Sequence, residues 1–353
     1  MSDKTNRGNF FEDFSLGQEI VHATPRTLSE GDASLYTALY GSRFAVHSSD
    51  MFAMALGFEA APIDDMLAFH TVFGKTVPDI SLNAVANLGY AAGRFGVPVY
   101  PGDTLRATSS VIGLKENSNG KTGVVYVHCV GFNQRDEAVL DYVRWVMVRK
   151  RDVASPACDP VVPDLPDFVM DEELVIPEGL DMTGFDVTLS GSAMLWDDYE
   201  VGEKIDHVDG MTIEESDHML ATRLYQNTAK VHFNQHTQKD GRFGRRIVYG
   251  GHVISLARAL SFNGLANAFS VVAINAGAHV APTFADDTIY AWSEVLGKPD
   301  IAGRDDLGAL RLRTVACKDQ SCAAFPGIGE DGKYADSVVL DFDYTVLMPK
   351  RQD

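Results

Sequence analysis

The sequence predicts an α+β fold that the chain contains twice, each time as a central helix wrapped by an antiparallel sheet of about five strands. Two observations predict it. The first is an internal repeat, in which Tyr40 and His47 return as Tyr225 and His232, 185 positions later. The second is the order of patterns within each copy, where helical spacing gives way to strand-like runs. We interpret the chain as one fold duplicated and fused.

The first copy contains two predicted helices followed by strands. Residues 29–40 begin with Ser29, a favourable helix cap, and continue with acidic residues in the first turn. Residues 64–74 are apolar on most sides, so we expect this helix to be buried. Four β-rich runs, separated by turn-forming residues, then predict strands over residues 84–99, 104–114, 122–132 and 138–150.

The second copy repeats this order. Its central helix is predicted to start at Gly250-Gly251 and to run to Leu260. It holds roughly 16 additional residues, which we place in a surface loop within residues 297–337. Between the copies, five prolines among acidic residues indicate a linker. The predicted organisation is a first domain over 1–152, a linker over 153–190 and a second domain over 191–353.

Composition limits the classes of partner. The net charge of −19 argues against nucleic acid and anionic membranes. No run approaches the ~20 apolar residues of a membrane span, and the first residues lack the apolar core of a signal peptide. The four scattered cysteines are typical of free thiols. We therefore expect a cytoplasmic protein without nucleic-acid or membrane partners.

Several short motifs follow one another in a recognisable order. They are Gly41 to His47, Pro62 to Leu67, Arg94-Phe95, Pro98-Val99 and Gly102-Asp103. In this order, and in its duplication, the chain resembles the MaoC-like (R)-specific enoyl-CoA hydratases of the double hot-dog fold. The members that it resembles most over its length hydrate mesaconyl-CoA reversibly to β-methylmalyl-CoA. The resemblance implies a hydro-lyase with an acyl-CoA substrate and no metal or redox cofactor, associated as a homodimer or higher homo-oligomer.

The chain departs from the family pattern at its catalytic aspartate. The family's Asp precedes the His by five residues, where this chain has Ser42 in the first half and Asn227 in the second. Neither half therefore has the usual Asp–His pair. A carboxylate at Asp50, Asp64 or Asp65 is an open alternative for that function.

Hydration of an unsaturated thioester requires a base for water, an acid for the α-carbon and donors for the thioester oxygen. The second half meets these needs better: His232 as base or acid, Asn227 to hold water, and Gly250 or Gly251 to donate an N–H at a helix start. His47 is the weaker catalytic candidate. We expect the first half to bind CoA, as the resemblance implies, through Ala60, Ala61, Pro62, Ile63, Asn83, Ala84, Val85, Ala86, Arg94, Phe95 and Gly96. A cation such as Arg43 or Arg223 is expected near the second carboxylate of a mesaconyl group.

Other interpretations remain open at this point. His22 and His207 recur in strand-like segments, so we expect them to be structural. His232 and His236 are four residues apart, but without a third ligand they do not predict a metal site. The rival functions are hydration of simpler enoyl-CoA substrates, acyl-CoA binding without catalysis, and, less favoured, thioester hydrolysis.

Overall fold

The computed structural model describes residues 4–352, and its strands fall into two sets of five. Every strand predicted in the first copy is confirmed, with bounds that differ by a few residues. The strands are β1 (Glu19–Thr27), β2 (Ala84–Phe95), β3 (Thr104–Glu116), β4 (Thr122–Phe132), β5 (Ala138–Arg149), β6 (Lys204–Thr212), β7 (Ser270–His279), β8 (Thr288–Gly297), β9 (Leu307–Lys318) and β10 (Val338–Pro349).

The helices lie in matching places in the two copies. The predicted cap of the first helix is confirmed, because Ser29 Oγ accepts the N–H of Asp32 and the helix ends at Gly41 in the left-handed conformation. The helices are α1 (Glu30–Tyr40), α2 (Ala45–Ser48), α3 (Asp50–Ala55), α4 (Asp65–Thr76), α5 (Val187–Ser190), α6 (Glu215–Leu224), α7 (Lys230–Phe233), α8 (Gln235–Gln238), α9 (Gly250–Leu260) and α10 (Phe262–Leu265).

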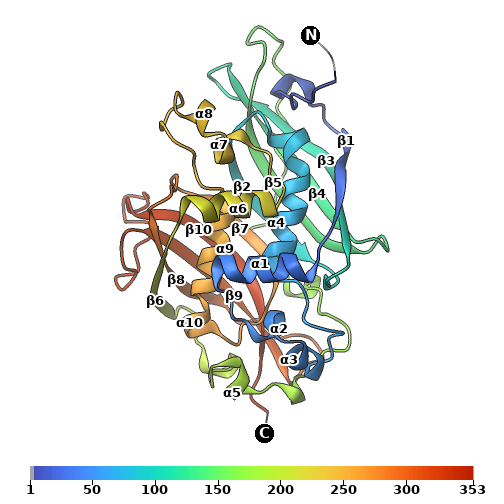
Figure 1. Cartoon of the computed structure of the whole chain (residues 1–353), viewed down its shortest axis with the longest axis vertical. Helices are drawn as coiled ribbons and strands as arrows, with labels where there is room; N and C mark the ends of the chain where they lie inside the picture. Colours follow the sequence, from blue (N-terminus) through green and yellow to red (C-terminus); the bar gives the residue numbers. More distant parts are fainter. Residues whose placement is uncertain (1–3, 353) are drawn as a thin grey trace.

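The strands of both copies form one continuous antiparallel sheet. Its order is β1-β3-β4-β5-β2-β7-β10-β9-β8-β6, so the second half of the order repeats the first in reverse. The copies join where β2 pairs with β7, through Tyr90 opposite Gly277 and Ala91 opposite Ala276. The long helices α4 and α9 lie side by side on one face of this sheet (Figure 1). An approximate two-fold axis therefore relates the two copies.

The largest hydrophobic core belongs to both copies. Residues of α4 such as Phe69 pack in the same cluster as Tyr249 and Ile254 of the second copy. On the approximate axis, the hydroxyls of Tyr40 and Tyr225 are 2.7 Å apart. These are the two tyrosines of the sequence repeat, and each meets its own counterpart.

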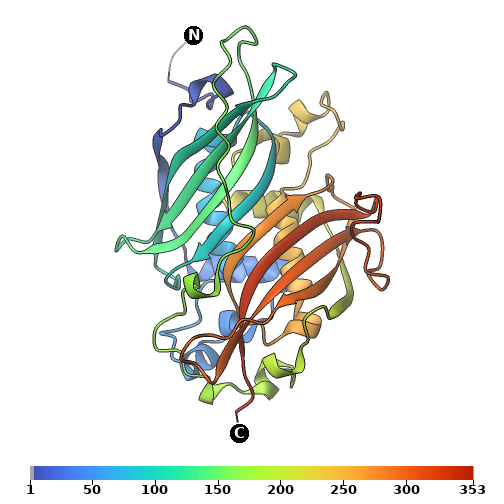
Figure 2. The same ribbon diagram turned by 180° about the vertical axis from the view of Figure 1, so that it is seen from behind.

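The first part of residues 153–190 crosses the outer face of the first copy's sheet, the face opposite α4, and the rest continues past the second copy's strands toward α3 (Figure 2). Leu114 of β3 and Val161 exchange two backbone hydrogen bonds there, of 2.9 and 2.8 Å. Because Pro163 and the carbonyl of Val161 both lie where a side chain on Gly113 would be, the contact depends on that glycine. Residues around Val161 therefore pair with the sheet, while Leu180 and Met182 are buried in a core cluster. The predicted linker and domain bounds stay predictions.

The additional residues of the second copy lie mainly between β9 and β10. Residues 319–337 connect these strands, whereas residues 133–137 connect their counterparts β4 and β5. This position is within the predicted range. Within residues 4–352, none of the helices has the length and apolar character needed to cross a bilayer.

Candidate active site

The two repeated histidines occupy equivalent positions, each as the third residue of a four-residue helix. His47 lies in α2 and His232 in α7. In each case Nδ1 contacts a backbone carbonyl 15 residues later, Pro62 O at 3.1 Å and Ile247 O at 3.0 Å. A carbonyl only accepts hydrogen bonds, so Nδ1 carries the hydrogen. In the neutral ring, the lone pair of each histidine is therefore on Nε2.

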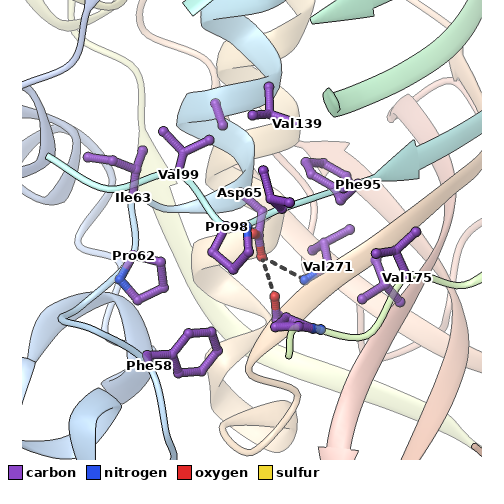
Figure 3. Close-up of a pocket in the computed structure, with 16 residues that line it drawn as sticks. Phe58, Pro62, Ile63, Asp65, Phe95, Pro98, Val99, Val139, Val175 and Val271 are labelled. Carbon is purple, nitrogen blue, oxygen red and sulfur yellow. Dashed lines mark hydrogen bonds between the residues drawn. The ribbon is translucent and has the colours of Figure 1, made fainter. Parts of the chain in front are cut away.

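The environment of His47 favours its charged form. Its Nε2 is 3.4 Å from Asp65 Oδ2. Burial lowers the pKa of His47, but the charges of Asp65 and Asp64 and the hydrogen bonds to Asp65 and Pro62 outweigh it and raise that pKa to about 9. Asp65 Oδ2 also accepts from Val271 N at 2.7 Å and Ser270 Oγ at 3.1 Å (Figure 3). At neutral pH His47 is thus a cation paired with a carboxylate, and it cannot accept a proton.

The environment of His232 favours its neutral form. No ion pair involves His232 within residues 4–352. Burial lowers its pKa to about 4, assisted by the nearby His218 and opposed by the hydrogen bond to Ile247. At neutral pH the ring is uncharged, with its lone pair on Nε2. His232 is therefore the one of the repeated pair that can act as a general base.

The helix starts next to these histidines also differ. At α4, Asp64 caps the helix by accepting the N–H of Met66 at 2.9 Å, and the first helical residue is Asp65. At α9, the helix begins with Gly250-Gly251 and has no side-chain cap. The first N–H groups of a helix lack intrahelical acceptors, so an uncapped start can stabilise negative charge on a ligand. Of the two helix starts, only that of α9 is uncapped and can stabilise a negative charge on a ligand in this way.

Both glycines of α9 are needed for packing. A Cβ on Gly250 would lie 2.3 Å from Cε1 of His279, and one on Gly251 would lie 2.5 Å from Cε1 of His70. The two imidazoles thus lie directly against the start of the helix. Burial lowers the pKa of His279 to about 4 and that of His70 to about 3, so both rings are neutral.

The residues that replace the family aspartate serve as local hydrogen-bond partners. Asn227 is buried, and its Oδ1 accepts the N–H of Ala229 at 3.0 Å, which leaves its amide N–H groups available. Ser42 Oγ donates to Asp64 at 3.2 Å. Asp50 accepts the N–H of Ala61 at 2.9 Å and fixes that loop. Of the three acids considered as substitutes, Asp65 is the one paired with His47.

The segments expected to bind CoA do not converge on one place. Pro62, Ile63, Phe95 and Gly96 line a small cleft, in part open to solvent, together with Asp65 (Figure 3). Ala60 and Ala61 precede this lining in the same loop. Asn83, Ala84, Val85 and Ala86 lie at the opposite end of β2 from Phe95. Residues 83–86 correspond, in the second copy, to the region of Ser270–Val272 in β7, and Ser270–Val272 lie beside Asp65. Because Gly250 is the counterpart of Asp65, the fold symmetry places residues 83–86 beside Gly250.

Two of the three arginines named from the sequence make contacts within the chain. Arg94 forms ion pairs with Glu173 at 2.9 Å and Asp141 at 3.6 Å. Arg43 is exposed, and its guanidinium lies 4.5 Å from the ring centre of Phe262. The structural interpretation of His22 and His207 agrees with their contacts. Both are buried, and their Nε2 atoms are 2.8 Å from the equivalent hydroxyls of Ser109 and Ser293.

Sequence reasoning missed a buried cluster of histidines and tyrosines between the copies. Tyr40 OH lies 2.9 Å from His252 Nδ1, and Tyr90 OH lies 3.2 Å from His279 Nε2. The ring of Tyr249 packs against that of His232 with centres 5.5 Å apart. In the sequence, only the recurrence of Tyr40 as Tyr225 at the spacing of the repeat pointed to this cluster. Nothing local in the sequence links His279, at the end of a strand, to Gly250.

The sequence matches a known family and characterised relatives over nearly its full length. The family model described as Mesaconyl-CoA hydratase matches residues 1–330. A beta-methylmalyl-CoA dehydratase of Chloroflexus aurantiacus is 69% identical over 351 residues, which are 99% of this chain and 100% of the relative. A mesaconyl-CoA hydratase of Cereibacter sphaeroides is 63% identical over 347 residues, which are 98% and 100% of the two chains.

Solved structures support the same fold. A protein of Chloroflexus aurantiacus, described as a MaoC domain protein dehydratase, superposes with a TM-score of 0.98 at 68% identity and covers 99% of this chain and 100% of that one. A protein of Mycobacterium tuberculosis described as having a double hot-dog fold superposes with a TM-score of 0.77 at 24% identity, covering 97% and 98%. The predicted double hot-dog fold is thereby confirmed.

Proposed function

Because this chain belongs to the mesaconyl-CoA hydratase family, we propose that it catalyses the reversible addition of water to mesaconyl-CoA to give β-methylmalyl-CoA. The observation that carries this proposal is the identity of 63% and 69% to relatives named for this reaction, over nearly the whole of both chains. The predicted hydro-lyase class follows from the same relationship.

The site at His232 supplies the chemistry in this proposal. Nε2 of the neutral imidazole takes a proton from water, and the resulting hydroxide oxygen bonds to the β-carbon. The electron pair of the double bond moves toward the thioester oxygen, which the N–H groups of Gly250 and Gly251 stabilise. The imidazolium then returns its proton to the α-carbon. Asn227 holds the water through its free amide N–H groups.

The first copy contributes to substrate binding. The start of β2, Asn83–Ala86, is the part of the first copy that the fold symmetry places beside Gly250, and Val85 is 47% exposed there. It would form the surface for CoA at the His232 site. Pro62, Ile63, Phe95 and Gly96 instead line the cleft at Asp65, whose apolar walls suit a part of the ligand without charge.

A second assignment for the same reaction rests on one observation, the contact between His47 and Asp65. It restores an Asp–His pair in the first copy. Against it stand the positive charge of His47 at neutral pH and the occupied start of α4. These features make His47 a poor base, so we favour His232.

The test compares two matched variants on mesaconyl-CoA, followed through the absorbance of the enoyl group. We expect His232→Ala to lower kcat by about 10²–10⁴-fold, the usual contribution of a general base. We expect His47→Ala to retain most of kcat and to lose stability. Equal residual activities would remove the assignment of roles. Binding of substrate by the wild type without loss of enoyl absorbance would reject the hydratase function itself.

We further propose a cytoplasmic location and a homodimer or larger assembly. The four cysteines are free thiols, which suits a reducing compartment. The two edges of the long sheet, β1 and β6, are available for association. Light scattering of the purified chain measures its mass in solution, and a mass of 38.5 kDa would contradict the assembly.

A further inference from the structure

A fully buried arginine lies in β5 without a carboxylate partner. Arg144 has 0% exposure, and no ion pair of residues 4–352 includes it. Nη2 donates to Thr76 Oγ1 at 2.6 Å and to Ser81 Oγ at 3.2 Å, and the guanidinium lies 4.2 Å from the ring centre of Phe73. Nε and Nη1 have no hydrogen-bond partner. A buried cation with free donors is costly, and an anion that arrives with a ligand would offset that cost.

Two neighbours of Arg144 also have unused polar atoms. Both amide atoms of Asn87 and the hydroxyl of Tyr142 are buried without a partner. Across residues 4–352 ten side-chain atoms are in this state, and five of them belong to these three residues. Such atoms are rare in folded proteins and concentrate where a ligand supplies the missing partner. The thiol of Cys129 lies among them, but burial raises its pKa, so it supplies no counter-charge.

Strand pairing places Asn87 and Arg144 on the same face of the sheet. Asn87 lies opposite Val146, and Tyr90 lies opposite Arg144. Side chains of opposed residues share a face, as do those two apart on a strand. This face is the one that packs on α4, because Arg144 contacts Phe73 and Thr76 of that helix.

The polar cluster borders the site at His232. Tyr90, opposite Arg144, contacts His279 at 3.2 Å, and His279 packs against Gly250. On the other side, the ring centre of Phe73 is 5.6 Å from that of Tyr249, which is itself 5.5 Å from that of His232. Two rings, Phe73 and Tyr249, thus lie between Arg144 and the proposed base, and Tyr90 and His279 lie between Arg144 and the start of α9.

The other copy lacks this cluster. The counterparts of Arg144 and Asn87 are Tyr344 and Val272. Tyr344 lines a small cavity together with Met66, the counterpart of Gly251. By the fold symmetry, Arg144 and Gly251 face one another in the same way. The buried cation and the uncapped helix start therefore occur together, and only on the side of His232.

We propose that Arg144 and Asn87 bind the free carboxylate of the acyl group and so select a dicarboxylic thioester. The inference rests on the proposed function. In a mesaconyl thioester this carboxylate is attached to the carbon that receives the hydroxyl, so its receptor must lie on the same side of the molecule as the base and within reach of the bound acyl group. Nε and Nη1 of a guanidinium form a planar pair of donors that matches the two carboxylate oxygens. The Asn87 amide donates a further hydrogen bond.

The alternative cations fit this function less well. Arg43 and Arg223 are exposed, so water already solvates them and a carboxylate gains little there. Lys75 is buried, but its ammonium donates to the side chain of Gln226. Among these groups, Arg144 alone combines full burial with unused donors.

The experiment compares two thioesters that differ at one group. Mesaconyl-CoA carries the carboxylate, and (E)-2-methylbut-2-enoyl-CoA carries a methyl group in its place. We expect Arg144→Gln to lower kcat/KM for mesaconyl-CoA roughly 100-fold or more, because a charged partner is left unpaired. The kcat/KM for the methyl analogue should change less than about threefold. The ratio of kcat/KM for mesaconyl-CoA to kcat/KM for the methyl analogue should therefore fall sharply. Arg144→Lys should restore part of that ratio.

The matched control is Arg258→Gln. Arg258 is also buried and lies 3.6 Å from the ring centre of Phe44, but it belongs to α9 of the other copy and donates to the carbonyl of Ala268. We expect it to lower stability and to leave the ratio unchanged. If Arg144→Gln does not fold, Asn87→Val tests the same receptor, because valine is the residue of the other copy at that position. It should lower the ratio by about tenfold.

The outcomes separate the two proposals. The carboxylate receptor is rejected if Arg144→Gln lowers both kcat/KM values equally while thermal melting stays normal. It is also rejected if neither Arg144→Gln nor Asn87→Val changes the ratio of the two kcat/KM values. In both cases the proposed hydratase function is unaffected. If the wild type hydrates neither thioester, the proposed function fails, whatever the variants do.

Discussion

At the scale of single residues, the two repeated histidines show how environment gives opposite properties to the same side chain. Each donates Nδ1–H to a backbone carbonyl at nearly the same distance. The two histidines differ in the group that lies next to Nε2. For His47 this group is the carboxylate of Asp65, whereas no carboxylate pairs with His232 within residues 4–352. A carboxylate raises the pKa of a histidine, and burial without one lowers it.

Stability should depend on pH through these histidines. Burial lowers the pKa of His70 and His252 to about 3, and of His207, His232 and His279 to about 4. Between these values and the ordinary 6.5, the unfolded chain binds protons that the folded chain does not. The free energy of unfolding is therefore complete above pH 6.5 and falls as pH decreases toward 4, by up to about 1.4 kcal/mol per pH unit for each histidine.

Urea unfolding at pH 7.5, 6.0, 5.0 and 4.5 measures this loss. His47 has the opposite sign, since its pKa is raised to about 9. Its contribution is complete below pH 6.5 and is lost as pH rises through 9. His47→Gln should therefore remove an alkaline decrease and leave the acidic one. A free energy of unfolding that stays constant from pH 7.5 to 4.5 would contradict the buried, neutral state of the five rings.

At the scale of elements, helices and strands were predictable because their signals are local. The cap at Ser29, the glycines that begin α9 and the alternating runs of β3 to β5 are each short local patterns, of 13 residues at most. The contacts that form the site join residues far apart in sequence, as between Asp65 and Val271, 206 positions apart. No single sequence specifies such contacts. Arg144 was not predicted as a site residue, because it is distinguished by side-chain donors without hydrogen-bond partners, and a sequence does not show which donors lack partners.

The start of α9 provides a test of the proposed oxyanion donors. Gly250→Ala would push a methyl group into the ring of His279 and displace the helix start from the reacting atoms. We expect kcat to fall about 10²-fold or more, in line with the loss of an oxyanion donor. Steady-state kinetics on mesaconyl-CoA, with circular dichroism to confirm folding, measures the effect.

The control for this test is Gly297→Ala at the end of β8. The nearest atom to its added Cβ would be Cβ of Arg311 at 3.7 Å, an ordinary contact. It should change neither activity nor folding by a measurable amount. Full activity in Gly250→Ala would mean that the thioester oxygen is held elsewhere.

At the scale of the whole molecule, duplication was predictable and the joining of the copies was not. Fixed spacing in the sequence indicated two copies, but pairing between β2 and β7 depends on which sheet edges meet. The result is a single sheet and a core shared by both copies. The two predicted domains are thus joined through a shared sheet and a shared core, and their bounds stay a prediction.

This arrangement predicts a single cooperative unfolding transition. Separation of the copies would expose the core faces of α4 and α9 and the edges of β2 and β7, so neither copy should remain folded alone. Differential scanning calorimetry should show one peak whose calorimetric and van't Hoff enthalpies agree for the species in solution. Two resolved transitions, one for each copy, would show that the junction contributes little.

The contact between Tyr40 and Tyr225 has a consequence for the protein's history. Each residue meets its own counterpart across the approximate axis, which is the arrangement expected in a homodimer of half-length ancestors. In such an ancestor every mutation changed both active sites at once. Joining the genes removed that constraint, so the two sites could come to differ, as they do at Asp64-Asp65 and Gly250-Gly251. Specialisation of the two sites thus became possible only when the subunits became one polypeptide.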